Sequence, residues 1–509
     1  MSESKINISR RDSLKKLTAL TFVGAASPAI ALESPIDSKE NIQWDKAIDI
    51  AIIGSGFAGL AAAITAVKNG AKSVAIFEKM SVYGGNSAIN GGLFAVPESP
   101  LQSKENVKDS AKLMVKDQIA SGRGVADTTL LEHVAKNANK ALQLTLEAGA
   151  EYHPYLQQLG GHSKPRSYQT TVNCGAGITQ PMLQYARELG VKTYNRHKFN
   201  GFIQNEQGDV TGIKLVKGFY FGEDRGQTIN VKATRGVIMA SGGFAQNIPL
   251  RMAQDPTLNA EVGCTNVKGA TGDGLLAMLR IGATPIHMAH IQSGPWASPD
   301  EGGFGYVSNY SLFNFPHSVA INRATGQRFM NEIADRKTRC DAELTCRDEN
   351  GNPLPPILVT SYHYSKHHSS LKKVLKYGVG WQFDTLEELA NHFNVPISPL
   401  KKQIEQYNQY TKSGVDEQFG KIMDLAKNKP IVPPFTAVRL WPKAHYCQGG
   451  VQINKRAQVL DSYSGKPIRG LLAAGEVTGG VHGVSRLGSC AIPECLVMGM
   501  TAGQTIMEV

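Results

Sequence analysis

Apolar residues run without interruption from residue 48 to residue 53, and a glycine-rich turn and an alanine-rich stretch follow directly. An unbroken apolar run of this length is typical of a parallel strand that is buried on both faces. The alanine-rich stretch predicts a helix over residues 58–68, and a second apolar run predicts a strand over residues 73–77. The order strand, helix, strand predicts an α/β fold that opens with a Rossmann-like unit.

The turn after the first strand has the spacing G-x-G-x-x-G, supplied by Gly54, Gly56 and Gly59, and the second strand ends at Glu78. In a dinucleotide-binding unit the helix N-terminus carries the pyrophosphate, and an acid about 20 residues further on binds a ribose hydroxyl. Strand, turn, helix, second strand and acid occur here in that order. This arrangement favours a dinucleotide site over an incidental tight turn.

A second glycine-rich stretch, KMSVYGGNSAINGG, begins directly after Glu78, where an NAD domain would usually continue into another strand. The chain also has a strand-like run at residues 236–244, a glycine-rich turn around Asp273 and an apolar run that ends at Glu476. These segments favour FAD over NAD, with Glu476 suited to a ribityl hydroxyl. Because the Glu476 segment lies far along the chain, we expect a discontinuous FAD-binding domain.

Two further stretches have helical periodicity, at residues 130–149 and 398–414, and the sequence contains no internal repeat, low-complexity tract or membrane-spanning run. The 509 residues exceed what one simple core accommodates, so we expect two or more structural units. The formal net charge is +11, but no dense basic stripe with interleaved aromatic residues is present. These properties argue against a nucleic-acid partner and favour an acidic substrate or redox partner.

The N-terminal segment carries Arg10 and Arg11, then a short apolar stretch, then an A-x-A-like site that ends at Ala31. The apolar stretch is too short to span a bilayer. The order of these three regions predicts a twin-arginine signal peptide over residues 1–31. We therefore expect export to the periplasm in the folded state.

The seven cysteines are widely separated and form neither a C-x-x-C-H haem-attachment motif nor paired C-x-x-C zinc motifs. We therefore expect the chain to carry no haem and no iron–sulfur cluster of its own. His363, His367 and His368 have no Asp or Cys ligands nearby in the sequence, so we interpret them as a solvated face and expect no metal site.

Taken together, these motifs resemble the fumarate reductase and succinate dehydrogenase flavoprotein superfamily, most closely its soluble flavocytochrome c fumarate reductase branch, over residues 46–509. The resemblance implies an FAD-binding domain at residues 46–288 and 446–509, with an inserted α+β clamp (capping) domain at residues 289–445. It also implies noncovalent FAD, because Asn86 stands where membrane-bound relatives carry the histidine that links the flavin. The residues assigned to FAD are Gly54, Gly56, Ala58, Gly59, Glu78, Lys79, Asn86, Ser87, Gly91, Gly92, Phe202, Asp273, Tyr446, Glu476, Ala491 and Ile492.

The resemblance assigns the substrate carboxylate to Arg486, in the run VHGVSRLGS, and to His445, in the run HYCQGG. A guanidinium presents two parallel N–H donors to a carboxylate, so the substrate should be an acid. The alternatives are a structural ion pair for Arg486 and a buried, hydrogen-bonded role for His445. Gly92 and Ser489 are expected to complete the substrate contacts beside them.

Arg336 follows the segment QRFMNE and occupies the place of the family's catalytic arginine. The resemblance implies that reduced FAD passes a hydride from N5 to the β-carbon of an activated C=C bond. Arg336 would protonate the α-carbon from the opposite face. An arginine is a poor acid in water, so this role requires a dry, closed site. The alternatives are electrostatic stabilisation of the enolate and a plain surface arginine.

The start of the clamp departs from the family pattern. Gly294 stands where fumarate reducers carry a histidine that holds the second carboxylate, and Ser311 and Asn314 replace an acid and a relay arginine. A carboxylate buried without a cationic partner would cost several kcal/mol. The departures therefore favour a monocarboxylate over fumarate.

Aromatic residues crowd the same segment, where they either line a pocket for an apolar tail or belong to the clamp core. They are Trp296, Phe304, Tyr306, Tyr310, Phe313 and Phe315. We expect Tyr310, Ser311 and Asn314 to contact the substrate, which would be acrylate, methacrylate or an aryl acrylate such as cinnamate. Urocanate is an alternative, with Tyr306 or Tyr310 near its ring.

The sequence thus predicts a periplasmic FAD-dependent reductase of α,β-unsaturated carboxylates that serves as a terminal reductase in anaerobic respiration. Because the chain has no haem motif, we expect a separate c-type cytochrome to donate the electrons. The alternatives are a fumarate or urocanate reductase, an FAD dehydrogenase that oxidises a saturated acid or ketosteroid-like substrate, and a non-catalytic flavin electron carrier.

Overall fold

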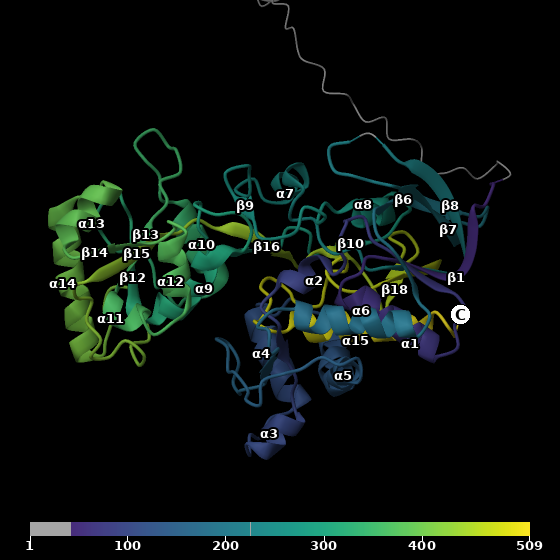
Figure 1. Ribbon diagram of the computed structural model, residues 1–509, viewed down its shortest axis with the longest axis horizontal. Helices are drawn as coiled ribbons and strands as arrows, with labels where there is room; N and C mark the ends of the chain where they lie inside the picture. The colour runs from purple at the N-terminus through teal and green to yellow at the C-terminus, as the bar shows by residue number, and fades with distance from the viewer. Residues whose placement is uncertain (1–41, 224, 509) are drawn as a thin grey trace, which may run out of the picture. The chain divides into compact units, whose positions relative to one another are not determined.

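A computed structural model describes residues 42–223 and 225–508 (Figure 1). The predicted signal peptide at residues 1–31 lies outside the described residues. None of the described helices is both long and apolar enough to cross a membrane.

The largest sheet is built around β1 (Lys46–Ile53), which pairs in parallel with β2 (Val74–Phe77) on one side and β8 (Gln227–Met239) on the other. Ile50 and Ile52 are fully buried, as expected of a central strand that is covered on both faces. The strand order is β18-β19-β8-β1-β2-β5, and β7 pairs with β6 and β8. The other strands are β5 (Lys192–Tyr194), β6 (His197–Gln204), β7 (Val210–Lys217), β18 (Gln458–Leu460) and β19 (Pro467–Ala473).

Helices pack together around α1 (Phe57–Lys68), which contacts α15 (Ala491–Thr505) along much of its length (Figure 1). A Cβ atom at Gly499 of α15 would lie 2.3 Å from the backbone oxygen of Ala58 in α1. The absence of a side chain therefore lets the two helix backbones approach closely. Two further helices pack here, α5 (Thr128–Glu147) on α15 and α6 (Ala176–Glu188) on α1.

Short elements complete this part of the chain. They are α2 (Gly85–Ile89), β3 (Leu93–Ala95), α3 (Pro100–Lys104), α4 (Ala111–Ser121), β4 (Ser167–Gln169), α7 (Ile248–Gln254), α8 (Asp273–Arg280), β10 (Pro285–Ile286) and β17 (Gly450–Val451).

The inserted segment forms a separate antiparallel sheet of order β12-β13-β15-β14, drawn mostly in green in Figure 1. Its strands are β12 (Ser318–Ile321), β13 (Ile357–Ser361), β14 (Trp381–Phe383) and β15 (Phe435–Arg439). Side chains alternate between two apolar clusters: Ile357 and Val359 belong to one, and Leu358 to the other. This period of two means that both faces of the sheet are covered.

Helices cover the two faces of the clamp sheet. The apolar cluster on one face includes residues of α13 (Leu386–Phe393) and α14 (Ile397–Ser413). The cluster on the other face includes residues of α9 (Gly305–Asn314) and α12 (Ser370–Lys376). The remaining helices of the insertion are η1 (Phe315–His317), α10 (Arg336–Leu344) and α11 (Tyr362–Ser365).

A buried cluster of charges stabilises the clamp next to α10. Arg328 pairs with Glu332 at 2.7 Å and with Asp416 at 2.8 Å, and Lys421 pairs with Glu332 at 3.1 Å. All four side chains are inaccessible to solvent. Because Glu332 lies just before α10, the cluster fixes the segment that leads to Arg336.

The chain enters the clamp through β11 (Ile291–Gly294) and returns through β16 (Lys443–Cys447), and these two strands pair antiparallel. The strand β9 (Gly263–Cys264) pairs with β16 on its other side. The predicted α/β fold, with a discontinuous domain built on a parallel sheet and an α+β insertion, is confirmed. The domain boundary at residues 289–445 stays a prediction, and it falls close to the two crossing strands.

Candidate active site

A cavity of about 840 Å³ lies where the parallel strands end. Gly54, Glu78, Ser241 and Glu476 follow β1, β2, β8 and β19 and line it. In open α/β sheets, ligands bind at this edge, and the volume lies within the range of cofactor sites. Clamp residues, among them Arg336, complete the lining. The cavity therefore joins the glycine-rich turn to the inserted domain.

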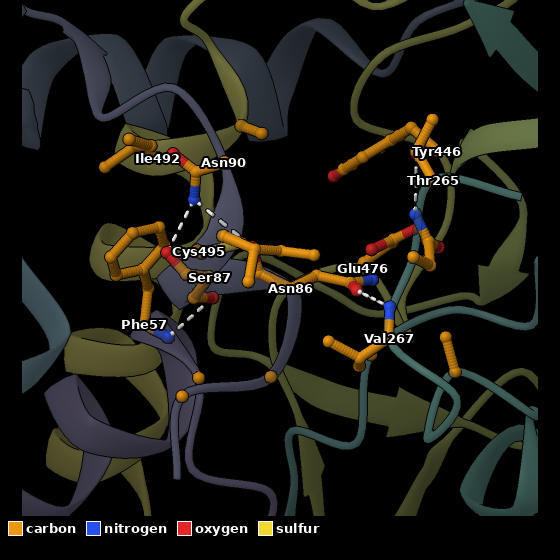
Figure 2. Close-up of a pocket in the computed structure, with 18 of the residues that line it drawn as sticks. Phe57, Asn86, Ser87, Asn90, Thr265, Val267, Tyr446, Glu476, Ile492 and Cys495 are labelled. Atoms are coloured by element: carbon orange, nitrogen blue, oxygen red, sulfur yellow. Dashed lines mark hydrogen bonds between the residues drawn. The ribbon is translucent and has the colours of Figure 1, made fainter. Parts of the chain in front are cut away.

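The glycine-rich turn after β1 is packed against the second glycine-rich stretch. A Cβ atom at Gly59 would lie 2.0 Å from the backbone oxygen of Gly54, so only glycine fits there. At Gly56 a Cβ atom would lie 2.9 Å from Oγ of Ser87. That Oγ accepts a hydrogen bond from the backbone N–H of Phe57 at 3.0 Å (Figure 2). The N-terminus of α1 is thus held at the floor of the cavity.

Three charged groups from two distant segments, the end of β2 and the start of α8, line the cavity together. The Glu78 carboxylate accepts hydrogen bonds from Ser55 N–H at 3.2 Å and Ser55 Oγ at 2.7 Å. The Lys79 ammonium pairs with Asp273 at 2.8 Å. These contacts fix the acid at the end of β2, where a ribose hydroxyl binds in a dinucleotide site.

Asn86 lies between the two sides of the cavity in Figure 2, and its Oδ1 accepts a hydrogen bond from Val267 N–H at 2.9 Å. The Glu476 Oε1 atom accepts one from Cys447 N–H at 2.9 Å. Burial raises the pKa of Glu476 to about 7. Near neutral pH this carboxyl can therefore donate or accept a hydrogen bond with a ligand hydroxyl.

Polar atoms in the lining indicate that a ligand belongs here. Ser241 Oγ and Asn266 Oδ1 are buried and have no hydrogen-bond partner among the described residues. Leaving such an atom unpaired costs about 1–3 kcal/mol. Together with the glycine-rich turn and the two carboxyl groups, these atoms fit FAD, which has a pyrophosphate, hydroxyls and ring nitrogens to pair with them.

Arg486 lies in the loop between β19 and α15, and its side chain borders the cavity. The residue is only 8% exposed, with its guanidinium 4.7 Å from the centre of the Tyr446 ring. One NH group donates to the backbone oxygen of Leu487 at 3.1 Å, and Nε has no partner among the described residues. No acidic side chain is paired with Arg486 in the described part of the chain. The geometry therefore leaves this cation free for an anionic ligand.

His445 lies on β16 beside Arg486, with its Nδ1 atom 2.8 Å from Oγ1 of Thr265. Burial, with the charges of Arg486 and Arg336, lowers the pKa of His445 well below its ordinary value. The imidazole is therefore neutral at physiological pH. It can offer a hydrogen bond to a ligand without adding a charge.

Arg336 is the first residue of α10 and lines the same part of the cavity. Burial, together with the charges of Arg486 and Arg339, lowers the pKa of Arg336 to about 9. One of its NH groups donates to Oε1 of Gln292 at 3.2 Å. This arginine is therefore a far better acid than one on the surface.

Residues 49–492 match the FAD binding domain family. The chain belongs to this FAD-binding family. It is 66% identical over 98% of its length to the acrylate reductase flavoprotein subunit of Shewanella woodyi, and covers 99% of that protein. It is 32% identical over 96% of its length to the urocanate reductase of Eggerthella lenta, covering 80% of that protein. The open form of a flavocytochrome c3 fumarate reductase is similar in structure, with a TM-score of 0.78 at 27% identity over 91% of this chain and 79% of that one. As a family member, the protein binds FAD and is an FAD-dependent oxidoreductase.

The structure brings most of the predicted site residues of this family member to one cavity. Those that line it are Gly54, Gly56, Ala58, Glu78, Lys79, Asn86, Ser87, Gly91, Asp273, Arg336, His445, Tyr446, Glu476, Arg486, Ser489, Ala491 and Ile492. Gly59 and Gly92 are not in the lining. Both pack against backbone nearby, Gly92 with a Cβ position 2.8 Å from the carbonyl of Cys174. Their placement fits a role in shaping the turns.

The clamp residues expected to contact substrate lie elsewhere. Tyr310, Ser311 and Asn314 are fully buried inside the clamp, where the Tyr310 hydroxyl bonds Thr436 at 2.6 Å. The neighbouring residues Tyr306, Asn309 and Leu312 of α9 line the cavity instead. In this structure the opposite face of the helix therefore lines the cavity, and the substrate contacts of Tyr310, Ser311 and Asn314 stay a prediction.

Phe202, which is predicted to bind FAD, is not in the lining of the cavity, and its role stays a prediction. Phe199 lines the cavity, and the Phe202 ring packs against the Phe199 ring with the ring centres 4.9 Å apart. The pairing of β6 with β7 shifts between Phe199 and Gly201, so simple alternation along the strand does not predict which side chain faces the ligand.

Gln292 is a site residue that the motifs alone did not identify. It lies on β11, accepts from Arg336, and donates through Nε2 to Ser485 Oγ at 3.0 Å and to the backbone oxygen of Arg486 at 3.3 Å. Gln292 thus ties the helix that carries Arg336 to the loop that carries Arg486. The only sequence signal for Gln292 is that it lies two residues before Gly294, a position that departs from the family pattern.

Proposed function

We propose that this FAD-binding family member reduces the C=C bond of an α,β-unsaturated monocarboxylate, with acrylate as the first candidate, and that its FAD is noncovalent. The observation that carries the proposal is the meeting of Arg336, His445 and Arg486 at one end of the FAD cavity. The 66% identity to an acrylate reductase flavoprotein subunit supports the same conclusion. Asn86, rather than a histidine, in the second glycine-rich stretch supports noncovalent binding.

The substrate carboxylate binds to Arg486 and His445. Arg486 supplies the positive charge, because its guanidinium is desolvated and has no acidic partner in the described structure. His445 supplies a neutral hydrogen bond, and Thr265 fixes the orientation of its ring. A charge-assisted pair in a poorly hydrated site is stronger than the same pair in water.

When bound, FAD supplies the hydride that the β-carbon of the substrate receives. Arg336 gives the proton to the α-carbon, so one hydride and one proton convert the C=C bond to CH–CH. The lowered pKa of Arg336, to about 9, supports this role because the proton is more easily released than from an exposed guanidinium. Gln292 holds the donating group through the 3.2 Å hydrogen bond.

We further propose that a separate c-type cytochrome donates the electrons and that the enzyme serves anaerobic respiration in the periplasm. The sequence supports this with Arg10 and Arg11 in an export-type segment and with the lack of a haem-attachment motif. Replacing both arginines with lysine should retain a tagged chain in the cytoplasm, which fractionation measures. Normal export of that variant would contradict the twin-arginine route.

An anaerobic panel of acids with reduced methyl viologen tests the reaction. Acrylate, methacrylate, cinnamate, urocanate and fumarate are compared with the holoenzyme. We expect a monocarboxylate to oxidise the dye and fumarate to do so poorly. Arg336→Ala should lower the rate about 10²–10⁴-fold, the usual contribution of a positioned acid. Arg469→Ala, at a side chain that is 82% exposed, is the matched control and should keep full activity.

Other outcomes of the same panel identify the alternatives. Fast fumarate turnover would mean that a second carboxylate is accommodated. Activity only with an oxidised dye and a saturated acid would mean that the enzyme works in the dehydrogenase direction. No activity in either the reductase or the dehydrogenase direction, with FAD bound, would favour a non-catalytic flavin electron carrier.

A further inference from the structure

Trp296 occupies the space that a side chain at position 294 would need. A Cβ atom built on Gly294 would lie 2.9–3.1 Å from three atoms of the Trp296 indole. Contacts that short would force the indole or the backbone to shift, so the two positions are coupled sterically. The large side chain at 296 therefore fits best beside glycine at 294.

The indole of Trp296 touches the groups that act on the substrate. It lies 4.7 Å from the Arg336 guanidinium, ring centre to Cζ, and 5.6 Å from the His445 ring in an edge-on arrangement. Trp296 lines the cavity although the residue is only 3% exposed. The indole is therefore a wall of the substrate end of the cavity.

Packing behind the indole keeps this wall in place. Trp296 belongs to the apolar cluster of the clamp that also contains Val307, Tyr310 and Phe315. Interiors of this kind are close-packed and resist the displacement of a large ring. A substrate atom that needed the space of the indole would have to disrupt the clamp core.

The cations of the cavity are not arranged to hold a second anion beside Trp296. The lysine and arginine side chains among the described lining residues are Lys79, Lys373, Arg336 and Arg486. Lys79 is paired with Asp273, and Lys373 is exposed with its ammonium 5.6 Å from the Tyr306 ring centre. Arg336 does contact the indole, but the proposed reaction uses it as the proton donor, so a carboxylate pressed against the indole would lose its hydration without gaining a further cation from the described lining.

We propose that Trp296 determines substrate specificity, its indole closing the site against any enoate that carries a second carboxylate or a bulky group on the β-carbon. This inference rests on the proposed function and deepens it. Gly294 is its steric partner, because any side chain at that position would press on the ring in its present place. The cation–π contact also positions Arg336 beside the substrate.

The test compares substrates within one enzyme preparation. Trp296→Ala holoenzyme is assayed with acrylate, crotonate and cinnamate, and selectivity is the ratio of kcat/KM values. We expect the ratio of crotonate or cinnamate to acrylate to rise about 10- to 100-fold, the range that a changed pocket wall produces. A ratio within twofold of wild type would overturn the inference. Partial unfolding cannot change the ratio, because both substrates meet the same active molecules.

Trp296→Phe distinguishes the steric effect of the ring from any effect of the indole N–H. That N–H is buried and has no partner among the described residues. A phenyl ring keeps most of the bulk and removes the donor, so the selectivity of wild type should be kept. Loss of selectivity in this variant would assign discrimination to the N–H group and contradict the steric wall. Lys373→Gln is the charge control and should leave the fumarate to acrylate ratio unchanged. A fall in that ratio would make Lys373 a second carboxylate site.

A paired replacement tests the coupling directly. Gly294→His alone should lose acrylate activity, because its side chain meets the indole. Gly294→His with Trp296→Thr should restore flavin-bound enzyme and raise the fumarate to acrylate ratio at least tenfold. Binding without turnover is followed by the thermal shift of the holoenzyme with propionate and with succinate. Equal responses of wild type and double variant to succinate would overturn the inference.

These results remain distinct from a failure of the proposed function. If wild type reduces no enoate, the proposed function is wrong whatever the variants do. If wild type reduces acrylate and selectivity is unmoved by the Trp296 changes, only the inference about Trp296 is wrong.

Discussion

Arg336 lies at a poorly hydrated end of the cavity, where burial and the nearby charge of Arg486 make a positive charge on Arg336 more costly. This environment lowers the pKa values of two groups. The pKa of Arg336 falls to about 9, and the pKa of His445 falls well below its ordinary value. The proposed function uses the first group as an acid and the second as a neutral hydrogen-bond donor.

These shifts predict the pH dependence of the reaction. Under the proposed function the protonated form of Arg336 is the active form, so kcat/KM should be level below its pKa and fall about tenfold per pH unit above about 9. His445 should cause no loss of kcat/KM between about pH 8 and about pH 6, because its neutral form persists throughout this range. A pH profile of kcat/KM with reduced dye measures both the alkaline decline and the level region below it. A profile that stays level to pH 10 would favour a purely electrostatic role for Arg336.

At the scale of elements, close approach of α1 and α15 holds the N-terminus of α1 beneath the cavity. Gly499→Ala would place a methyl group 2.3 Å from the backbone oxygen of Ala58. We expect destabilisation of about 1–3 kcal/mol and weaker FAD retention, because the helices must separate. Thermal unfolding and the flavin-to-protein absorbance ratio measure the two effects.

Gly160→Ala is the matched control, because a Cβ atom there meets nothing within 4 Å and the residue is exposed. Its stability and flavin content should equal those of wild type. Equal stability of Gly499→Ala and Gly160→Ala would show that the helices have room to spare.

The elements differ in how far the sequence determines them. The unit from β1 to β2 follows from local signals: a continuous apolar run, a glycine turn and an alanine-rich stretch. The sequence predicts a helix over residues 58–68, and the structure has α1 at Phe57–Lys68. The register of α9 does not follow in this way. Aromatic residues occur on both of its faces, so periodicity could not distinguish Tyr306, which lines the cavity, from Tyr310, which is in the clamp core.

The same distinction holds among the site residues. Arg336, His445 and Arg486 stand in motifs with strong family resemblance, and they reach the cavity. Gln292 and Trp296 act through contacts that depend on the pairing of β11 with β16 and on the clamp core. Such contacts join residues far apart in the sequence and become visible only when the fold is known.

At the scale of the whole molecule, the clamp has apolar clusters and a charge cluster of its own. Arg328→Met would leave the buried carboxylates of Glu332 and Asp416 short of a cation, at a cost of about 3–5 kcal/mol. We expect residues 295–440 to become sensitive to protease while FAD stays bound, because the FAD-binding domain has a separate core. Mass spectrometry of limited digests, with flavin fluorescence, measures both.

Lys337→Met is the control for that variant, since Lys337 pairs with Asp341 on the surface. An exposed pair contributes at most about 1 kcal/mol, so digestion should match wild type. Simultaneous loss of flavin and clamp in Arg328→Met would mean that the two domains unfold as one cooperative unit.

The two strands through which the chain crosses into and out of the clamp also carry Gln292 and His445. This limits the modularity of the enzyme. A chimera that exchanged residues 289–445 between relatives would transplant both side chains but leave behind Thr265, which orients His445, and Ser485, which binds Gln292. Recombination at the ends of the insertion would thus cut through the candidate active site. Grafting a new specificity requires carrying the partner loops of the host domain along with the clamp.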